Sequence, residues 1–331
     1  MSKKYFALFA ITVSLTAGAQ DFHLSQYDAA DLYMNPGSTG MFKGDAGRYR
    51  VAADYRSQWK SLGLKPFSTM YLSFDMPLQK YEDQWGVGGF VVNNHGAPGQ
   101  FRTIQFMGSG AYNIMHKSPE HYLTAGVQLG LIYKSYNQGD YTYDEQYESS
   151  SGTFNTSLNS GETFSKYSKT AFDAAIGINY QYGTPFQKYH PFGAFSIQHL
   201  AMPNESLSSE KNRMPMRFNF LGGCEMQLKE DFMLAPRMLY MYQRKAWEFS
   251  IGTMAYYTIK NSSLDAVFGV DYHHKDALVA HIGFRQGKSI FRFSYDINIA
   301  GLNDYTNGKG AWEFSLILVG AKDQPLFKPL F

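Results

Sequence analysis

Hydrophobic and polar residues alternate with a period of two along most of this chain of 331 residues. In the stretch 290–299, aromatic and aliphatic residues occupy every second position, and Arg292 and Asp296 are among the polar residues between them. Successive side chains of a β-strand point to opposite faces of the sheet. The pattern therefore predicts strands that have one apolar face and one polar face.

Fourteen segments carry such a pattern and have the length of a strand: 48–58, 67–77, 83–93, 101–115, 120–134, 170–182, 190–200, 215–228, 231–243, 246–258, 264–273, 277–286, 289–298 and 311–319. Most are close to the ~9–11 residues that a tilted strand needs to cross a bilayer, and single-chain bacterial barrels have an even number of strands. We therefore predict an all-β fold, a transmembrane antiparallel β-barrel of about 14 strands over residues 48–319. Because lipid offers no partner to unpaired backbone groups, we expect the first and last strands to pair.

The connections between these segments are of two kinds. Long polar connections follow the fifth, seventh and thirteenth segments, at 135–169, 201–214 and 299–310, whereas the connections after even-numbered segments are short. Outer-membrane barrels have long outer loops and short periplasmic turns. The pattern therefore places the N-terminus on the periplasmic side of the outer membrane.

The first residues have the three parts of a secretory signal. Lys3 and Lys4 precede an apolar stretch over 5–16, and Ala17-Gly18-Ala19 has the small-residue pattern of a cleavage site. The stretch is shorter than the ~20 apolar residues that a spanning helix needs. We predict a signal peptide over 1–19, an N-terminal segment over 20–47, the barrel over 48–319 and a C-terminal tail over 320–331.

Composition separates this barrel from a soluble one. Aromatic residues make up 17% of the chain and charged residues only 18%, against a usual quarter. The polar faces carry Ser, Asn, Tyr and Gly rather than the Lys and Glu of a water-facing sheet. Tryptophans recur near segment ends, as in the aromatic girdles of membrane barrels: Trp59, Trp85, Trp247 and Trp312.

Charge and cysteine content argue against other classes of protein. The formal charge is +2, and removal of Lys3 and Lys4 with the signal peptide leaves a neutral mature chain, which argues against nucleic acid as a partner. The single cysteine, Cys224, permits no intramolecular disulfide and no multi-cysteine metal site, and we interpret it as an inert buried or lipid-facing thiol.

Several motifs recur in a distinctive order. Residues 20–27 read Gln-Asp-Phe-His-Leu-Ser-Gln-Tyr, residues 32–37 read Leu-Tyr-Met-Asn-Pro-Gly, and residues 55–59 read Tyr-Arg-Ser-Gln-Trp. Near the C-terminus, 293–296 read Phe-Ser-Tyr-Asp and 312–316 read Trp-Glu-Phe-Ser-Leu. This order resembles the PorP/SprF family, outer-membrane proteins of the type IX secretion system of the Bacteroidetes, over the whole mature chain.

The resemblance implies a non-enzymatic barrel that supports secretion or surface attachment of proteins with a C-terminal sorting domain, including gliding adhesins in some members. It implies periplasmic ring subunits and lipoproteins of the system as partners, beside the secreted protein and outer-membrane lipid. The tail 320–331 departs from a strand-terminal assembly signal because it contains Pro325 and Pro329, and we interpret it as a contact segment.

The N-terminal segment lacks alternation, contains turn-forming residues and is too apolar for a free tail. We interpret it as folded into or across the periplasmic mouth, where it plugs the barrel or docks the ring; an ordered leader without a partner is the alternative. The candidate plug or docking residues are Gln26, Tyr33, Asn35, Pro36 and Gly40.

Charged residues of both signs fall on the predicted luminal faces: Arg48, Arg50, Asp54, Arg56, Asp75, Glu248, Arg292 and Asp296. Because unpaired buried charge is costly, a structural polar network is favoured over a substrate site. Such a lumen is also compatible with peptide binding or with passage of small solutes.

The connection 135–169 carries a group of acidic residues and tyrosines, of which the candidate contact residues are Asp140, Tyr143, Asp144 and Glu145. This composition suits a secreted partner or calcium, while a solvated outer loop is the alternative.

Catalytic motifs are weak. His273 and His274 are adjacent and point to opposite strand faces, and the run Gly86 to Gly89 lacks the helix that a phosphate loop requires. We therefore predict no catalytic, cofactor or metal residues. Two rival hypotheses remain: a channel for small or hydrophobic solutes with 21–47 as its plug, and an outer-membrane enzyme with dispersed site residues.

Overall fold

The computed structural model describes residues 21–41, 47–60, 66–78, 84–96, 101–118, 120–136, 142–159, 161, 167–184, 187–207, 211–300 and 306–321. The predicted signal peptide and residues 322–331 of the predicted tail lie outside these residues.

Fourteen antiparallel strands form a closed barrel in which each strand pairs with its neighbours along the chain. The strands are β1 (Gly47–Gln58), β2 (Phe67–Pro77), β3 (Trp85–Gly96), β4 (Phe101–Asn113), β5 (His121–Ser135), β8 (Ser168–Tyr182), β9 (Tyr189–Gln198), β10 (Arg217–Lys229), β11 (Phe232–Gln243), β12 (Ala246–Thr258), β13 (Leu264–His273), β14 (Ala277–Gln286), β15 (Ser289–Asn298) and β16 (Lys309–Ala321).

Closure of the barrel is made by β1 and β16, which pair from Tyr49 opposite Gly320 to Gln58 opposite Ala311. Each of the fourteen predicted segments coincides with one of these strands. The largest difference is at the end of β3, which continues to Gly96 instead of residue 93. The prediction of a closed antiparallel barrel with pairing of its first and last strands is confirmed.

Burial alternates along the strands in the sense expected of a membrane barrel. On β2, Met70, Leu72 and Phe74 are exposed on the outside, whereas Tyr71 and Ser73 between them are buried on the inside. Other strands repeat this arrangement, so the outer surface is an apolar band and the buried positions are largely polar. This is the inverse of a water-soluble barrel and is typical of outer-membrane proteins.

Aromatic side chains are paired near the strand ends. The rings of Trp85 and Tyr112 lie 4.7 Å apart at the start of β3, and those of Tyr55 and Trp312 lie 5.3 Å apart near the end of β1. Such amphipathic rings suit the lipid–water interface at both edges of the apolar band.

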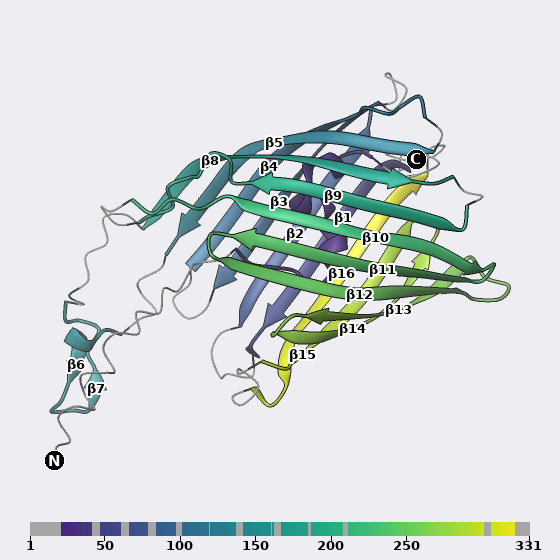
Figure 1. The fold of residues 1–331 in the computed structure, drawn as a ribbon. Helices are drawn as coiled ribbons and strands as arrows, with labels where there is room; N and C mark the ends of the chain where they lie inside the picture. The colour runs from purple at the N-terminus through teal and green to yellow at the C-terminus, as the bar shows by residue number, and fades with distance from the viewer. Residues whose placement is uncertain are drawn as a thin grey trace, which may run out of the picture.

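The two ends of the barrel differ in their connections. The strands β1, β3, β5, β9, β11, β13 and β15 all finish at one end, where the long connections 136–167, 199–216 and 299–308 lie. We call this the long-loop end, and the opposite end the short-turn end. The connection after β5 contains η6 (Asp144–Gln146) and a hairpin of β6 (Tyr147–Glu148) and β7 (Thr153–Phe154), which projects away from the ring of strands (Figure 1).

Inside the ring lie the short helices η1 (Tyr27–Ala29), α1 (Asp31–Met34) and η2 (Pro36–Ser38), drawn in purple in Figure 1. They belong to residues 21–41, which we call the luminal segment. Among the described residues, none of the helices is both long and apolar enough to cross a membrane.

Candidate functional site

The luminal segment runs lengthwise through the barrel. At the long-loop end, the backbone N–H of Asp21 donates to Oε1 of Gln243, the last residue of β11, at 3.0 Å. At the short-turn end, the backbone N–H of Gly40 donates to Oδ2 of Asp75, near the end of β2, at 2.6 Å. Because β11 and β2 finish at opposite ends, the segment passes from one mouth to the other. Sequence reasoning placed it in or across the periplasmic mouth, whereas in the structure it extends through the lumen from Asp21 at the long-loop end to Gly40 at the short-turn end.

The middle of the luminal segment is buried by the barrel wall. Leu32 has no exposed surface, and Leu24 and Tyr27 are only 3% and 2% exposed. These apolar residues form a core with inward residues of the wall, including Tyr71 and Phe90. The segment is therefore packed as part of the fold rather than lying loosely in a pore.

Of the sequence-predicted plug residues, Gln26 binds the barrel wall through both the nitrogen and the oxygen of its side-chain amide. Its Nε2 donates to Oγ of Ser294 and to the carbonyl of Glu313, each at 3.1 Å, and its Oε1 accepts from Oγ of Ser315 at 2.6 Å. The hydroxyl of Tyr33 accepts from Nη1 of Arg217 at 2.9 Å.

Asn35 and Pro36 lie against wall positions that have no side chain. Asn35 Nδ2 donates to the carbonyl of Ile178 at 2.7 Å. A Cβ added at Gly177 would lie 2.1 Å from Oδ1 of Asn35, and one added at Gly126 would lie 2.3 Å from the carbonyl carbon of Pro36. These glycines allow the backbone of the segment to approach the sheet closely.

At the short-turn end, Gly40 lies close to the barrel wall. Its φ of +63° lies in the left-handed region that favours glycine, and its Cα approaches Gly86 at the start of β3. The structure thus brings all five sequence-predicted plug residues to the inner wall, while their role as a docking site for a partner remains a prediction.

Three acidic residues of the luminal segment each meet a cationic residue of the wall. Asp28 contacts Nη1 of Arg237 at 2.8 Å and Nη1 of Arg292 at 2.7 Å. Asp31 forms an ion pair with Arg50. Asp21 accepts from Nε2 of His199 at 2.7 Å. The segment is therefore held by charge pairs distributed along its length.

Within the wall, Arg56 is the centre of a second set of contacts. Its guanidinium lies 2.7 Å from Asp296 on β15 and 2.8 Å from Glu313 on β16, and its Nη1 also donates to Oγ of Ser25 at 2.6 Å. All four side chains are buried. Strands β1, β15 and β16 and the luminal segment are thus joined at one point.

The remaining sequence-predicted luminal residues are placed as follows. Arg50 donates to Asp75 at 2.9 Å, and Glu248 lies 3.4 Å from Nδ1 of His23. Arg48 is half-buried at the start of β1. Asp54 is buried, but no cation pairs with it among the residues that the structure describes.

Sequence reasoning missed many of the luminal contacts, because it did not assign roles to residues that include Asp21, Asp28, Asp31, Glu313, Arg237 and His199. A signal was present: residues 20–41 contain three acidic residues and neither lysine nor arginine. Arginines at inward strand positions are the natural partners for those carboxylates.

His199, directly after β9, is a titratable group at the long-loop end that contacts two carboxylates. Its Nδ1 lies 2.7 Å from Asp173 and its Nε2 lies 2.7 Å from Asp21. Burial alone lowers the pKa of His199, but Asp21 and Asp173 raise it to about 9. Burial likewise acts to raise the pKa of Asp21, while His199 and Arg217 hold it well below its usual range.

Two cavities lie on either side of the luminal segment. One, of about 250 Å³ at the long-loop end, is lined by Leu24, Trp59 and His273 among others. The other, of about 450 Å³ at the short-turn end, is lined by residues that include Met254 and Lys288. Tyr27 borders both, so open space remains beside the luminal segment towards each end of the barrel.

Of the sequence-predicted outer-loop residues, Tyr143 precedes η6 and contacts the hydroxyl of Tyr136, while Asp144 and Glu145 are exposed. Asp140 lies outside the described residues. Binding of a partner or of calcium by this loop remains a prediction.

A closed barrel with an apolar outer band and a polar interior defines this chain as an integral outer-membrane protein. The type IX secretion system membrane protein PorP/SprF family matches residues 16–318, and the chain belongs to this family. The resemblance seen in the sequence motifs is thereby confirmed. No curated protein shows significant sequence similarity to the chain.

Solved barrels share the fold at low identity. The CymD monoaromatic hydrocarbon channel is 12% identical over 88% of this chain and 92% of its own, with a TM-score of 0.50. A TodX deltaS2S3 mutant monoaromatic hydrocarbon channel is 11% identical over 87% and 92%, with a TM-score of 0.50. At such identities these likenesses establish the fold alone.

Proposed function

We propose that this protein is a non-enzymatic outer-membrane component of the type IX secretion system that works through protein contacts. It supports secretion or surface attachment of proteins with a C-terminal sorting domain, including gliding adhesins. The observation that carries this proposal is the occupied lumen in a chain of the PorP/SprF family. Residues 24–37 are nearly all buried and are fastened through Asp28 and Asp31 to wall arginines, an arrangement suited to a scaffold rather than to an open pore.

The two ends of the barrel are suited to different partners. Long loops face outward in outer-membrane barrels, so we assign the long-loop end to the cell surface and the start of β1 to the periplasm. The secreted protein then meets η6 and the β6–β7 hairpin, and ring subunits or lipoproteins meet the short turns. In this orientation the luminal segment carries the chain from the outer mouth, at Asp21, back to the periplasmic mouth, at Gly40. The periplasmic position expected for the N-terminus then holds for the start of β1 but not for Asp21.

Deletion of the gene followed by mass spectrometry of surface proteins tests the proposal. Proteins with a C-terminal sorting domain should be lost from the surface and accumulate in the periplasm. An unchanged set of surface proteins would contradict the proposal.

A variant of the outer loop sharpens this test. The triple substitution Tyr143→Ala, Asp144→Asn and Glu145→Gln should reduce co-purification of the secreted partner while leaving ring subunits bound. A comparison variant carries Lys260→Ser and Ser262→Ala on the turn after β12, at the opposite end, and should leave recovery of the secreted partner unchanged. Equal partner recovery from the loop variant and the wild-type protein would remove this loop from the binding surface.

A second candidate function is a channel for small or hydrophobic solutes. The two luminal cavities favour it, since each is lined partly by apolar residues such as Leu24 and Met254. The fold neighbours that conduct monoaromatic hydrocarbons are compatible with it. Steady conductance of the wild-type protein in planar bilayers, with no co-purifying secretion component, would favour the channel over the scaffold.

A further inference from the structure

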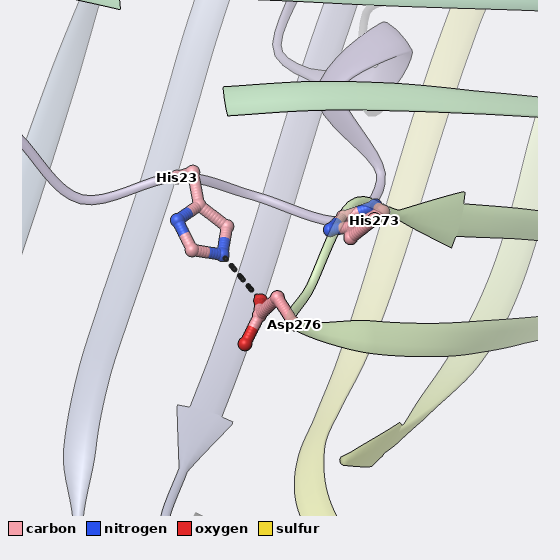
Figure 2. Close-up of side chains that lie close together, drawn as sticks. All are labelled: His23, His273 and Asp276. Carbon is pink, nitrogen blue, oxygen red and sulfur yellow. Dashed lines mark ion pairs between the residues drawn. The ribbon is translucent and has the colours of Figure 1, made fainter. Parts of the chain in front are cut away.

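A group of side chains of the types that ligate metal ions lies at the long-loop end of the lumen, beside the contact between His23 and Glu248. His23 comes from the luminal segment, His273 ends β13, and Asp276 lies on the turn to β14 (Figure 2). One ligand atom from each of the three lies within 4.8 Å of the others. All three line the cavity of about 250 Å³ at this end, so an ion has access to them.

The two imidazoles each present a nitrogen without a hydrogen-bond partner. Nε2 of His23 and Nε2 of His273 are buried and unsatisfied among the described residues. Nε2 of His23 lies 3.8 Å from Oδ2 of Asp276, which is longer than a hydrogen bond. Two such nitrogens beside one carboxylate have the chemistry and the proximity that a shared ligand requires.

Glu248 on β12 contacts the other nitrogen of His23. Its Oε2 lies 3.4 Å from Nδ1 of His23, opposite the nitrogen that faces Asp276. In metal sites a ligating histidine usually donates its second ring N–H to a carboxylate, which fixes the tautomer and orients the ring. Glu248 is placed to do this for His23.

We propose that His23, His273 and Asp276 bind a divalent transition-metal ion of the Zn²⁺ class, which fastens the luminal segment to the barrel wall. Two imidazoles and a carboxylate are ligands that Zn²⁺ accepts, and a solvent molecule from the cavity completes the tetrahedron. Bonds of ~2.0–2.1 Å to zinc require ligand atoms roughly 3–4 Å apart, so the Asp276 turn moves inward on binding. The side chain of Asp276 is 51% exposed, which leaves it free to do so.

This site adds a metal-dependent attachment of the luminal segment to the barrel wall, beside the ion pairs of the segment. It joins the first residues of the luminal segment to β13 and β14, strands that carry neither Arg56 nor its carboxylate partners Asp296 and Glu313. Loss of the ion therefore weakens the attachment of this end of the segment, while the contacts of Asp21 and Arg56 persist.

Zinc titration of the full mature protein, purified in detergent with a tag free of histidine and stripped with a chelator, tests the proposal. Isothermal titration calorimetry should show one Zn²⁺ per barrel, and Co²⁺ should give the visible absorption of a tetrahedral site. His23→Gln and His273→Gln should each weaken binding at least about 100-fold, and Glu248→Gln about 10–100-fold, the usual effect of losing an orienting carboxylate.

His274→Gln is the matched control, because His274 is the next residue along the chain and stacks on Trp247, with ring centroids 5.1 Å apart. It should bind Zn²⁺ as the wild-type protein does. Absence of stoichiometric binding, or equal affinity of wild type and His23→Gln, would overturn the proposal and leave His23 as an ion-pair partner of Glu248 alone. His23 lies outside the strands, so this variant keeps a folded barrel, which heat-dependent gel migration verifies.

A second measurement addresses the fastening itself. In a Cys224→Ala background, Ala29→Cys places a single thiol in the buried middle of the luminal segment. Zn²⁺ should slow its reaction with a maleimide at least about tenfold in this background but not when His23→Gln is added. An equal rate with and without Zn²⁺ would show that the ion does not hold the segment.

Discussion

Asp28 in the luminal segment and Arg292 on β15, 264 residues apart in the sequence, form an ion pair of 2.7 Å inside the barrel. Arg237 on β11, four strands from β15 around the ring, shares the same carboxylate. One aspartate thus links two strands that do not pair with each other.

Replacing Asp28 by Asn should loosen the luminal segment, because it leaves two buried guanidinium groups without this carboxylate. We expect the free energy of docking of the luminal segment to fall by about 3 kcal/mol, the lower end of the range for breaking a buried ion pair. The lower end applies because the Asp28 side chain is 30% exposed. Protease susceptibility of residues 21–41 in detergent-solubilised protein measures this. Asp144→Asn on the outer loop is the control and should change the susceptibility little; an equally resistant Asp28→Asn variant would contradict the role given to the pair.

Gly126→Val should prevent docking of the luminal segment and spare the barrel. A Cβ at this position would lie 2.3 Å from the backbone of Pro36, and the backbone cannot yield as a flexible side chain can. Planar-bilayer conductance should rise severalfold as the segment leaves the lumen. Gly108→Val is the matched control, since its added Cβ meets nothing closer than 3.8 Å; a rise of the same size in both variants would mean that docking is not the cause.

Attachment of the long-loop end of the segment should weaken at alkaline pH. The pKa of His199 is raised to about 9 by Asp21 and Asp173, above the ordinary value of about 6.5. A group with a raised pKa contributes its full stabilisation below the ordinary value and loses it as the pH rises through the folded value. The contribution of His199 to the attachment is therefore full at pH 6 and lost between about pH 7 and 10.

A spin label at Phe22→Cys in the Cys224→Ala background measures this attachment by its mobility. The mobile fraction should grow from pH 7 to pH 10 in otherwise wild-type protein. It should be high and nearly constant across this range when His199→Gln is added. A flat profile in the presence of His199 would contradict the assignment.

A charge placed on the apolar outer band should destabilise the membrane-inserted barrel according to its depth. Leu129 lies in the middle of β5 and is 57% exposed, so Leu129→Arg should cost about 2–4 kcal/mol. Phe101 begins β4 near the edge of the band, and Phe101→Arg should cost no more than about 1 kcal/mol. Denaturant titrations in lipid vesicles compare the two; equal costs would contradict the assignment of this surface to lipid.

The barrel was predictable because each strand carries its own signal. Alternation on a segment such as 67–77 is a local property, and closure then follows from the need to pair every backbone group in lipid. The path of the luminal segment carries no such signal, since its contacts, such as Asp28 with Arg292, join residues far apart. The β6–β7 hairpin also escaped prediction, because two-residue strands are too short to show a period.

The proposed metal site could not be predicted from the sequence for a related reason. His274 follows the last residue of β13 and stacks on Trp247, and the second imidazole beside His273 comes instead from His23 in the luminal segment. Only the path of the segment brings them together, and sequence periodicity does not contain that path.

The contacts of Arg56 have a consequence for biogenesis. Its carboxylate partners lie on β15 and β16, the last two strands to be synthesised, and Ser25 joins them from the luminal segment that precedes β1. The luminal segment therefore cannot reach its final position until the hairpin of β15 and β16 is present. Pairing of β1 with β16 and insertion of the luminal segment become a single late event in assembly. A chain truncated before β15 can complete neither.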